Sequence, residues 1–138
     1  MARIRDLDTA KLERIAVTPL NLVSFGSRGG RVWQFTVLFP MFLMREDGTK
    51  ETIFNEDDED ILFVLLARSF GGATVDTSPV RGIGLRAQEF ETNTHRRMTV
   101  LAARSRSTTR YFRALRRELE ASSGEEQILI LREELAVV

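Results

Sequence analysis

Arginine is the residue type in this sequence with the clearest capacity to bind a ligand. Residues 105–120 carry five arginines and only two glutamates, a net formal charge of +3. If this segment is helical, its outer face could contact the phosphates of a nucleic acid. The candidate binding residues are Arg110, Arg113, Arg116 and Arg117, with Tyr111 at the edge of the face. We favour the alternative, a solvated or protein-contacting face, because basic and acidic residues balance over the whole chain.

His95 is the single histidine of the chain and a candidate general base. With Glu89 or Glu91 beside it, the chain could be a small enzyme with a pocket at a sheet interface. The sequence offers His95 no closer carboxylate than Glu91, and it contains no Gly-x-Ser-x-Gly nucleophile motif. We therefore favour a histidine at the end of a loop and expect no catalytic residue.

Two further segments have the composition of ligand sites but simpler structural explanations. The acidic run 56–60 could bind Mg²⁺ through its carboxylates. On a helix, however, these side chains point around the axis, and negative charge favours the start of a helix. The glycine-rich run 26–30 could bind a phosphate, but it leads into a predicted strand rather than a helix. We expect a charged helix start and a hinge, with no metal and no cofactor.

Composition excludes several classes of protein. The 138 residues suffice for one domain, and 43% hydrophobic with 29% charged residues is ordinary for a globular chain. The absence of cysteine rules out disulfides and Cys-ligated zinc. We find no signal-peptide pattern and no apolar run of the roughly 18 residues needed to cross a bilayer. We expect a cytoplasmic protein that does not contact membranes.

The periodicity of the sequence predicts the elements that must position these residues. Alternating apolar residues predict strands at 31–39 (extendable to 44), 73–76, 96–104 and 127–132. The short stretch 50–54 could pair back as a hairpin arm, and 81–86 could be irregular or extended. Apolar residues at helical spacing predict helices at 58–70 and 109–122, each ended by a glycine. Residues 1–30 are expected to form an N-terminal arm with a short helix at 8–14, and residues 31–138 to form one domain.

The predicted order of the domain is strand, helix, strand, strand, helix, strand. This βαββαβ order is that of the ferredoxin-like split plait, an α+β fold in which a four-stranded antiparallel sheet carries two helices on one face. Trp33 and Phe35 lie on the more hydrophobic face of the first strand, so we expect that face to meet the helices rather than to stack bases. The other face of the sheet has no cover of its own.

The last predicted strand, 127–132, is apolar on both faces, so both faces need burial. A second copy of the chain is the simplest cover, and the alternative is the N-terminal arm folded over the open face. The predicted oligomer interface contains Val32, Thr36, Leu38 and Leu101, together with either Ile128 and Ile130 or Leu129 and Leu131.

The sequence Phe70-Gly71-Gly72-Ala73-Thr74 joins a predicted helix to a predicted strand. It resembles a group of small bacterial proteins with this junction, a later Gly-x-Trp element and a final strand preceded by Gln. Here Gly82-Ile83-Gly84-Leu85 stands in the Gly-x-Trp position without the Trp, and Gln127-Ile128-Leu129-Ile130 matches the ending. The resemblance covers residues 31–131, implies a plait-like α+β fold and supplies no catalytic residue.

The leading expectation is a non-catalytic module that self-associates as a homodimer or higher oligomer and serves in binding or assembly. A protein partner could also bind through the N-terminal arm. The alternatives are the small enzyme that uses His95 and a nucleic-acid-binding protein that uses the arginine-rich helix.

Overall fold

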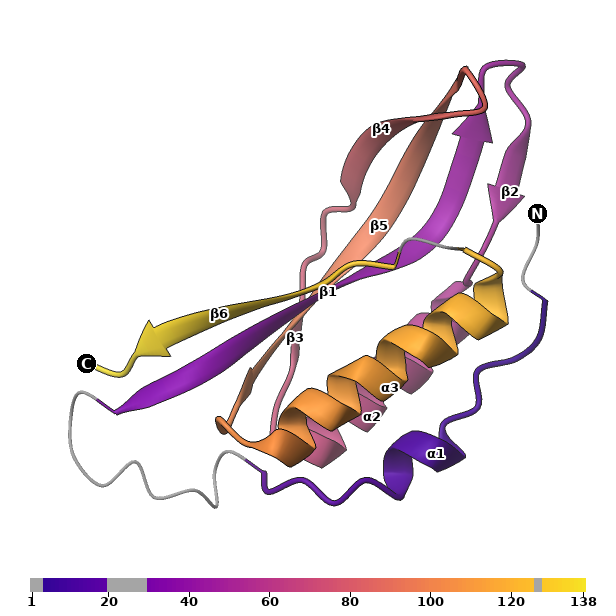
Figure 1. Cartoon of the computed structure of the whole chain (residues 1–138). Coiled ribbons are helices and arrows are strands. Elements are labelled where there is room, and N and C mark those ends of the chain that lie inside the picture. The colour runs from indigo at the N-terminus through magenta and orange to yellow at the C-terminus, as the bar shows by residue number, and fades with distance from the viewer. Residues whose placement is uncertain (1–3, 20–29, 126–127) are drawn as a thin grey trace.

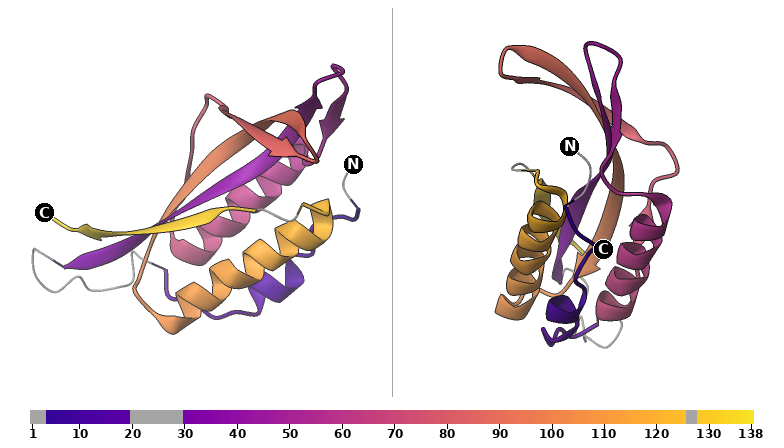
Figure 2. Two further views of the ribbon diagram at one scale, coloured as in Figure 1. Left: turned by 45° about the horizontal axis from the view of Figure 1, so that its top comes forward. Right: turned by 90° about the vertical axis from the view of Figure 1, so that its right-hand side faces the viewer.

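The structure is a computed structural model that describes residues 4–19, 30–125 and 128–138. Its described residues form three helices and one six-stranded sheet (Figure 1). The helices are α1 (Ala10–Glu13), α2 (Glu56–Phe70) and α3 (Arg106–Ser123). The strands are β1 (Arg31–Arg45), β2 (Lys50–Thr52), β3 (Thr74–Val75), β4 (Val80–Arg86), β5 (Glu89–Ala102) and β6 (Ile130–Ala136). α2 and α3 lie side by side on one face of the sheet (Figures 1 and 2).

The centre of the sheet is the long antiparallel pair of β1 and β5, from Trp33 opposite Ala102 to Arg45 opposite Glu91. β6 and β2 pair with the outer edge of β1 at its two ends, and β3 and β4 pair with the outer edge of β5. The register shifts between Pro40 and Phe42, and such a shift bends a strand. The far ends of β1, β4 and β5 extend beyond the helices and curl (Figure 2).

Local sequence signals explain where the two long helices begin and end. Asn55 caps α2, because its side chain accepts the Asp58 N–H at 2.9 Å while the Asp58 carboxylate accepts the Asn55 N–H at 2.9 Å. Ser105 caps α3 by accepting an N–H of the first turn at 3.2 Å. Gly71 and Gly124 end the helices in the left-handed conformation, which glycine adopts without strain.

The core lies between the helix-facing side of the sheet and the inner faces of α2 and α3, and stacked aromatic rings join these layers. Phe112 of α3 stacks on Phe35 of β1 with ring centroids 3.9 Å apart and on Phe70 of α2 at 5.1 Å. Tyr111 packs edge-on against Phe70, and its hydroxyl lies 3.2 Å from the Ser69 hydroxyl. Phe112 of α3 therefore contacts both the sheet and α2.

The predicted α+β class is confirmed, but the ferredoxin-like split plait with a four-stranded sheet and two helices is wrong. The described residues form six strands, and α1 adds a third helix. The largest difference is the hairpin of β4 and the first half of β5, which pairs all seven residues from Val80 to Arg86. Gly82, Gly84 and many polar residues weaken the apolar alternation that predicts a strand in this segment.

The turn of this hairpin has an unusual sequence for its backbone conformation. Ala87 and Gln88 take positive φ angles of 48° and 67°. Such two-residue turns usually contain Asn-Gly or Asp-Gly, and this one contains neither. Pairing with β1, which continues to Arg45, supports the hairpin where its own sequence does not.

The described part of the N-terminal arm, residues 4–19, lies against the helices. α1 sits between α2 and α3, on the side of the helices away from the sheet (Figures 1 and 2). Leu12 of α1 is 2% exposed and belongs to the core. This part of the arm therefore does not cover the open face of the sheet.

Candidate functional site

The sheet face opposite the helices carries exposed leucines. Pairing of the strands places Thr36 of β1 between Thr99 of β5 and Leu131 of β6. Leu101 and Leu131 are 42% and 51% exposed, and Leu129, just before β6, is 53% exposed. We call the surface formed by Leu101, Leu129, Leu131 and the β1 side chains that lie between them in the sheet the open sheet face.

Three of the predicted interface residues of β1 and β5 lie on this open sheet face. Thr36 and Leu38 are half-buried there, and Leu101 is exposed. Val32 instead is only 4% exposed, beside its cross-strand partner Leu135 of β6. Val32 is therefore already covered within a single chain.

The structure also decides between the two alternative pairs near the C-terminus. Ile128 is 5% exposed and belongs to the core, and Ile130 packs against the core. The reason is the register, because Ile130 lies opposite Val37, which points into the core and is 0% exposed. Leu129 and Leu131 consequently face outward, and Ile128 and Ile130 do not.

A cavity of about 130 Å³ lies between the curled hairpin and the connection from α3 to β6. Its lining includes His95 and Glu91 of β5, so the structure brings together two residues of the enzyme alternative. Glu89 is exposed and does not line the cavity. Other polar groups of the lining are Arg86, Asn93 and Glu125.

The two carboxylates that line this cavity, Glu91 and Glu125, pair with Arg86 rather than with His95. Arg86 Nε lies 3.9 Å from Glu91, and Arg86 Nη2 lies 3.4 Å from Glu125. Among the described residues no hydrogen bond or ion pair joins His95 to a carboxylate. Burial of His95 lowers the pKa of its imidazole below the ordinary value of 6.5. The cavity thus contains the right residue types without the orienting contact that a general base needs.

Replacing His95 by Gln is expected to reduce the acid sensitivity of the fold. Because the folded state lowers the pKa of His95, the unfolded chain binds this proton more readily, and stability falls as the pH drops below about 6.5. Thermal unfolding at about pH 7 and about pH 5 measures this effect, and the wild type should lose more of its Tm than the variant. An equal loss in both proteins would contradict the prediction.

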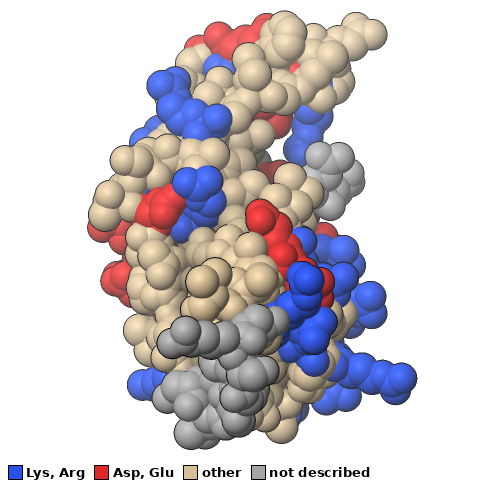
Figure 3. Space-filling view, turned by 90° about the vertical axis from the view of Figure 1, so that its left-hand side faces the viewer, with Lys and Arg blue, Asp and Glu red and all other residues tan. Residues whose placement is uncertain are grey.

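The arginines of α3 are exposed, and basic side chains gather on the α3 side of the molecule, at the right of Figure 3. Arg116 lies 3.7 Å from Glu120. Among the described residues, four arginines of α3 make no ion pair: Arg106, Arg110, Arg113 and Arg117. Tyr111, predicted at the edge of this face, is instead 0% exposed in the core, and burial raises the pKa of its hydroxyl. Its neighbours Phe70 and Phe112 hold it there.

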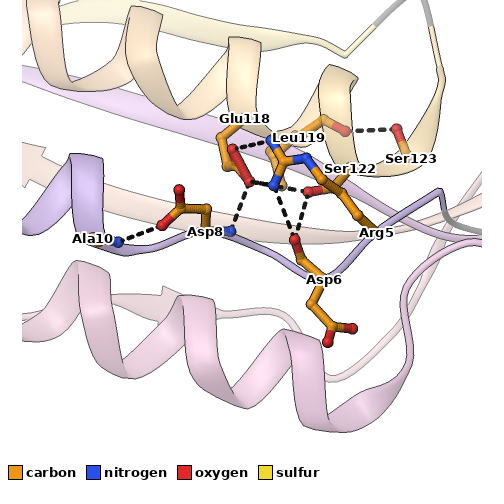
Figure 4. Close-up of polar contacts among 8 residues, drawn as sticks. All are labelled: Arg5, Asp6, Asp8, Ala10, Glu118, Leu119, Ser122 and Ser123. Atoms are coloured by element: carbon orange, nitrogen blue, oxygen red, sulfur yellow. Dashed lines mark hydrogen bonds and ion pairs between the residues drawn. The ribbon is translucent and has the colours of Figure 1, made fainter.

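A network around Glu118 of α3 holds the N-terminal arm in place (Figure 4). Glu118 is 6% exposed, and its two oxygens accept hydrogen bonds from the Arg5 guanidinium at 2.6 and 2.7 Å. Glu118 Oε1 also accepts the Asp8 backbone N–H at 2.7 Å and the Ser122 hydroxyl at 3.1 Å. The Ser122 carbonyl accepts the Ile4 N–H at 2.7 Å.

Opposing effects act on the Glu118 carboxyl group. Burial by itself raises its pKa, but the hydrogen bonds from Arg5, Asp8 and Ser122 and the charge of Arg5 outweigh burial and hold the pKa below the ordinary 4.5. Sequence reasoning missed this network. The available signal is that Glu118 falls on the same helix face as the buried Leu115, where an acid needs a cation from elsewhere.

Of the two remaining candidate segments, only the acidic run 56–60 lies fully within the described residues. In this run, Asp58 accepts the backbone N–H of the N-cap residue Asn55, and Glu59 lies 3.3 Å from Arg96. No three His, Asp or Glu side chains in the part of the chain described here are placed to hold a metal ion. The glycine-rich run 26–30 lies outside the described residues apart from Gly30. None of the described helices is long and apolar enough to cross a membrane.

The chain was compared with protein-family models, with curated proteins and with solved structures, and none of the three comparisons found a match.

Proposed function

We propose that this chain is a non-catalytic binding or assembly module that self-associates through its open sheet face. The main support is the position of the N-terminal arm, the other candidate cover for that face. The hydrogen bonds to Glu118 and the burial of Leu12 hold residues 4–19 on the side of the helices that faces away from the sheet. The described part of the arm thus leaves the leucines of the open sheet face half exposed, and a second copy of the chain covers them.

The residue types on the open sheet face support the same proposal. An antiparallel sheet with one solvated face usually carries polar residues there. Here Leu101, Leu129 and Leu131 are interrupted only by short or polar side chains such as Thr36 and Gln34. Two copies that pack this face around a two-fold axis bury the apolar residues and leave polar ones at the rim. A cytoplasmic location and relationship to the small bacterial proteins with the Phe-Gly-Gly-Ala-Thr junction are part of this proposal.

Replacing both Leu101 and Leu131 by Lys is expected to dissociate the oligomer, because two charges would have to be buried in the interface. Size-exclusion chromatography with light scattering should give the wild type a mass above the 15.7 kDa of one chain and the variant a mass equal to it. The matched control replaces Ile61 and Val64 of α2 by Lys. These are 50% and 48% exposed, and their replacement should leave the oligomer intact.

Two results would contradict self-association through this face. One is a wild-type protein that stays a single chain at high concentration. The other is an oligomer that survives the changes at Leu101 and Leu131 but dissociates when Ile61 and Val64 are changed.

A further inference from the structure

A groove runs between α3 and the strands β1 and β6. Two adjoining cavities of about 740 and 360 Å³ form it, and both are lined by Thr109 and Arg113. The larger cavity reaches Trp33 of β1, and the smaller one reaches Arg132 of β6. Apolar atoms of Phe112 line the smaller cavity, so the groove combines cationic walls with an apolar part. We call it the arginine groove.

Helical spacing brings the arginines to the groove. Arg106, Arg110, Arg113 and Arg117 follow one another at intervals of three or four residues, which places them on one face of α3. All four line the larger cavity. The adjacent face of the helix, with Phe112, is buried in the core and fixes the rotation of α3.

Most of the positive charge of the arginine groove is not neutralised by ion pairs. No carboxylate among the described residues lines either cavity. Glu118 binds Arg5 and Glu134 pairs with Arg104, and none of these residues lines either cavity. Glu120 lies 3.7 Å from Arg116 of the smaller cavity, but the four arginines of the larger cavity make no ion pair among the described residues. The net charge of the chain is zero, yet the described part of α3 gathers four unpaired arginines on one face.

An aromatic ring stands beside these cations. Trp33 is half-buried, with its ring edge-on to Phe35 at 6.1 Å, and the Arg132 guanidinium lies 4.4 Å from the centre of the indole ring. Proteins that bind single-stranded nucleic acids combine a positively charged groove with aromatic rings on which bases stack, and arginine planes add to this stacking. Both features meet in the arginine groove.

We propose that the arginine groove binds single-stranded nucleic acid. The arginines of α3 contact backbone phosphates, and a base stacks beside Trp33 and Arg132. A duplex keeps its bases stacked inside and could not use Trp33 in this way, and an acidic peptide would leave both the ring and the apolar part of the groove without a partner. This site lies on the helix side of the sheet, so it is independent of the open sheet face.

Fluorescence anisotropy with a labelled oligodeoxythymidylate of about 12 nucleotides tests the charge contribution. Replacing Arg110 and Arg113 by Glu should weaken binding roughly tenfold or more and make its salt dependence shallower. The control replaces Arg68 and Arg81 by Glu. These arginines are exposed, lie on α2 and β4, and give the same change in net charge. The control should bind within about twofold of the wild type, because generic attraction by net charge is a minor contribution here.

Trp33 provides a second readout, because it is the only tryptophan of the chain. Stacking of a base should quench its fluorescence when the oligonucleotide is added, and the variant Trp33→Leu should bind more weakly. The Arg110 and Arg113 variant should also quench less at the same oligonucleotide concentration. Circular dichroism checks that each variant is folded, including Trp33→Leu, whose side chain is half-buried.

Several results would overturn the proposal. Equal weakening by the Arg68 and Arg81 control would show unspecific attraction. Unchanged Trp33 emission, or duplex binding as tight as single-strand binding, would exclude a single strand in the groove. Binding of anionic vesicles without binding of the oligonucleotide would assign the groove to a membrane surface instead.

Discussion

Replacing Glu118 by Ala is expected to release the N-terminal arm and to lower the free energy of unfolding by about 2–4 kcal/mol. The change removes the acceptor for the Asp8 N–H and the Ser122 hydroxyl as well as the partner of Arg5. Because the Arg5 side chain is 42% exposed, water solvates it once the contact is lost, so most of the effect comes from Asp8, Ser122 and the loosened packing of the arm.

Thermal unfolding measures the loss, at roughly 3–5 °C of Tm per kcal/mol for a domain of this size. Limited trypsin digestion should cut the released arm after Arg5, Lys11 or Arg14 earlier than in the wild type. The matched control is Glu120→Ala on the same helix. The Glu120 side chain is 34% exposed and lies 3.7 Å from Arg116, and this contact should contribute about 0–1 kcal/mol. Equal effects of the two substitutions would refute a specific role of Glu118.

Glu118→Ala should also make the free energy of unfolding less sensitive to acid. The pKa of Glu118 is below 4.5 in the folded state, so at low pH the unfolded chain binds its proton more readily. The contribution of Glu118 is complete above about pH 4.5 and is lost as the pH falls further. The wild type should therefore lose more stability than Glu118→Ala between about pH 5 and pH 3.

Replacing Phe112 by Ala is expected to cost about 3–5 kcal/mol, the range for removing a buried aromatic ring. Phe112 is 3% exposed and stacks on both Phe35 and Phe70, so its loss leaves a cavity where three elements meet. Urea unfolding followed by circular dichroism measures the change. Phe90→Ala at the tip of the hairpin is the control, because Phe90 is 54% exposed and its removal should change stability by about 0.5 kcal/mol or less. Similar losses for the two rings would contradict this description of the core.

Elements with strong local signals could be predicted from the sequence. The helix predicted at 58–70 is α2, Glu56–Phe70, and the one predicted at 109–122 is α3, Arg106–Ser123. Both end at the predicted glycines, because a residue in the left-handed conformation stops a helix and glycine adopts it freely. β1 reaches Arg45, in line with its predicted extension to Met44.

Elements that depend on distant partners could not be predicted in the same way. Two glycines interrupt β4 and weaken its strand signal, and β4 forms because β5 offers it a paired backbone. Residues 87–88 turn the chain without the usual turn residues. The six-stranded sheet therefore replaces the predicted four-stranded one, although the α+β class is the same.

The same distinction between local signals and distant partners applies to the candidate sites. The sequence by itself determined which residues are available, namely the arginines of one helix, a single histidine and leucines on alternating strand positions, because residue type and period are local properties. Only the tertiary structure decided that Glu118 binds the arm, that Tyr111 is buried, that Leu129 and Leu131 rather than Ile128 and Ile130 face outward, and that Trp33 lies beside the arginines. The physical reason is that these outcomes depend on strand register and helix packing, which bring together residues up to about a hundred positions apart and leave no trace in local spacing.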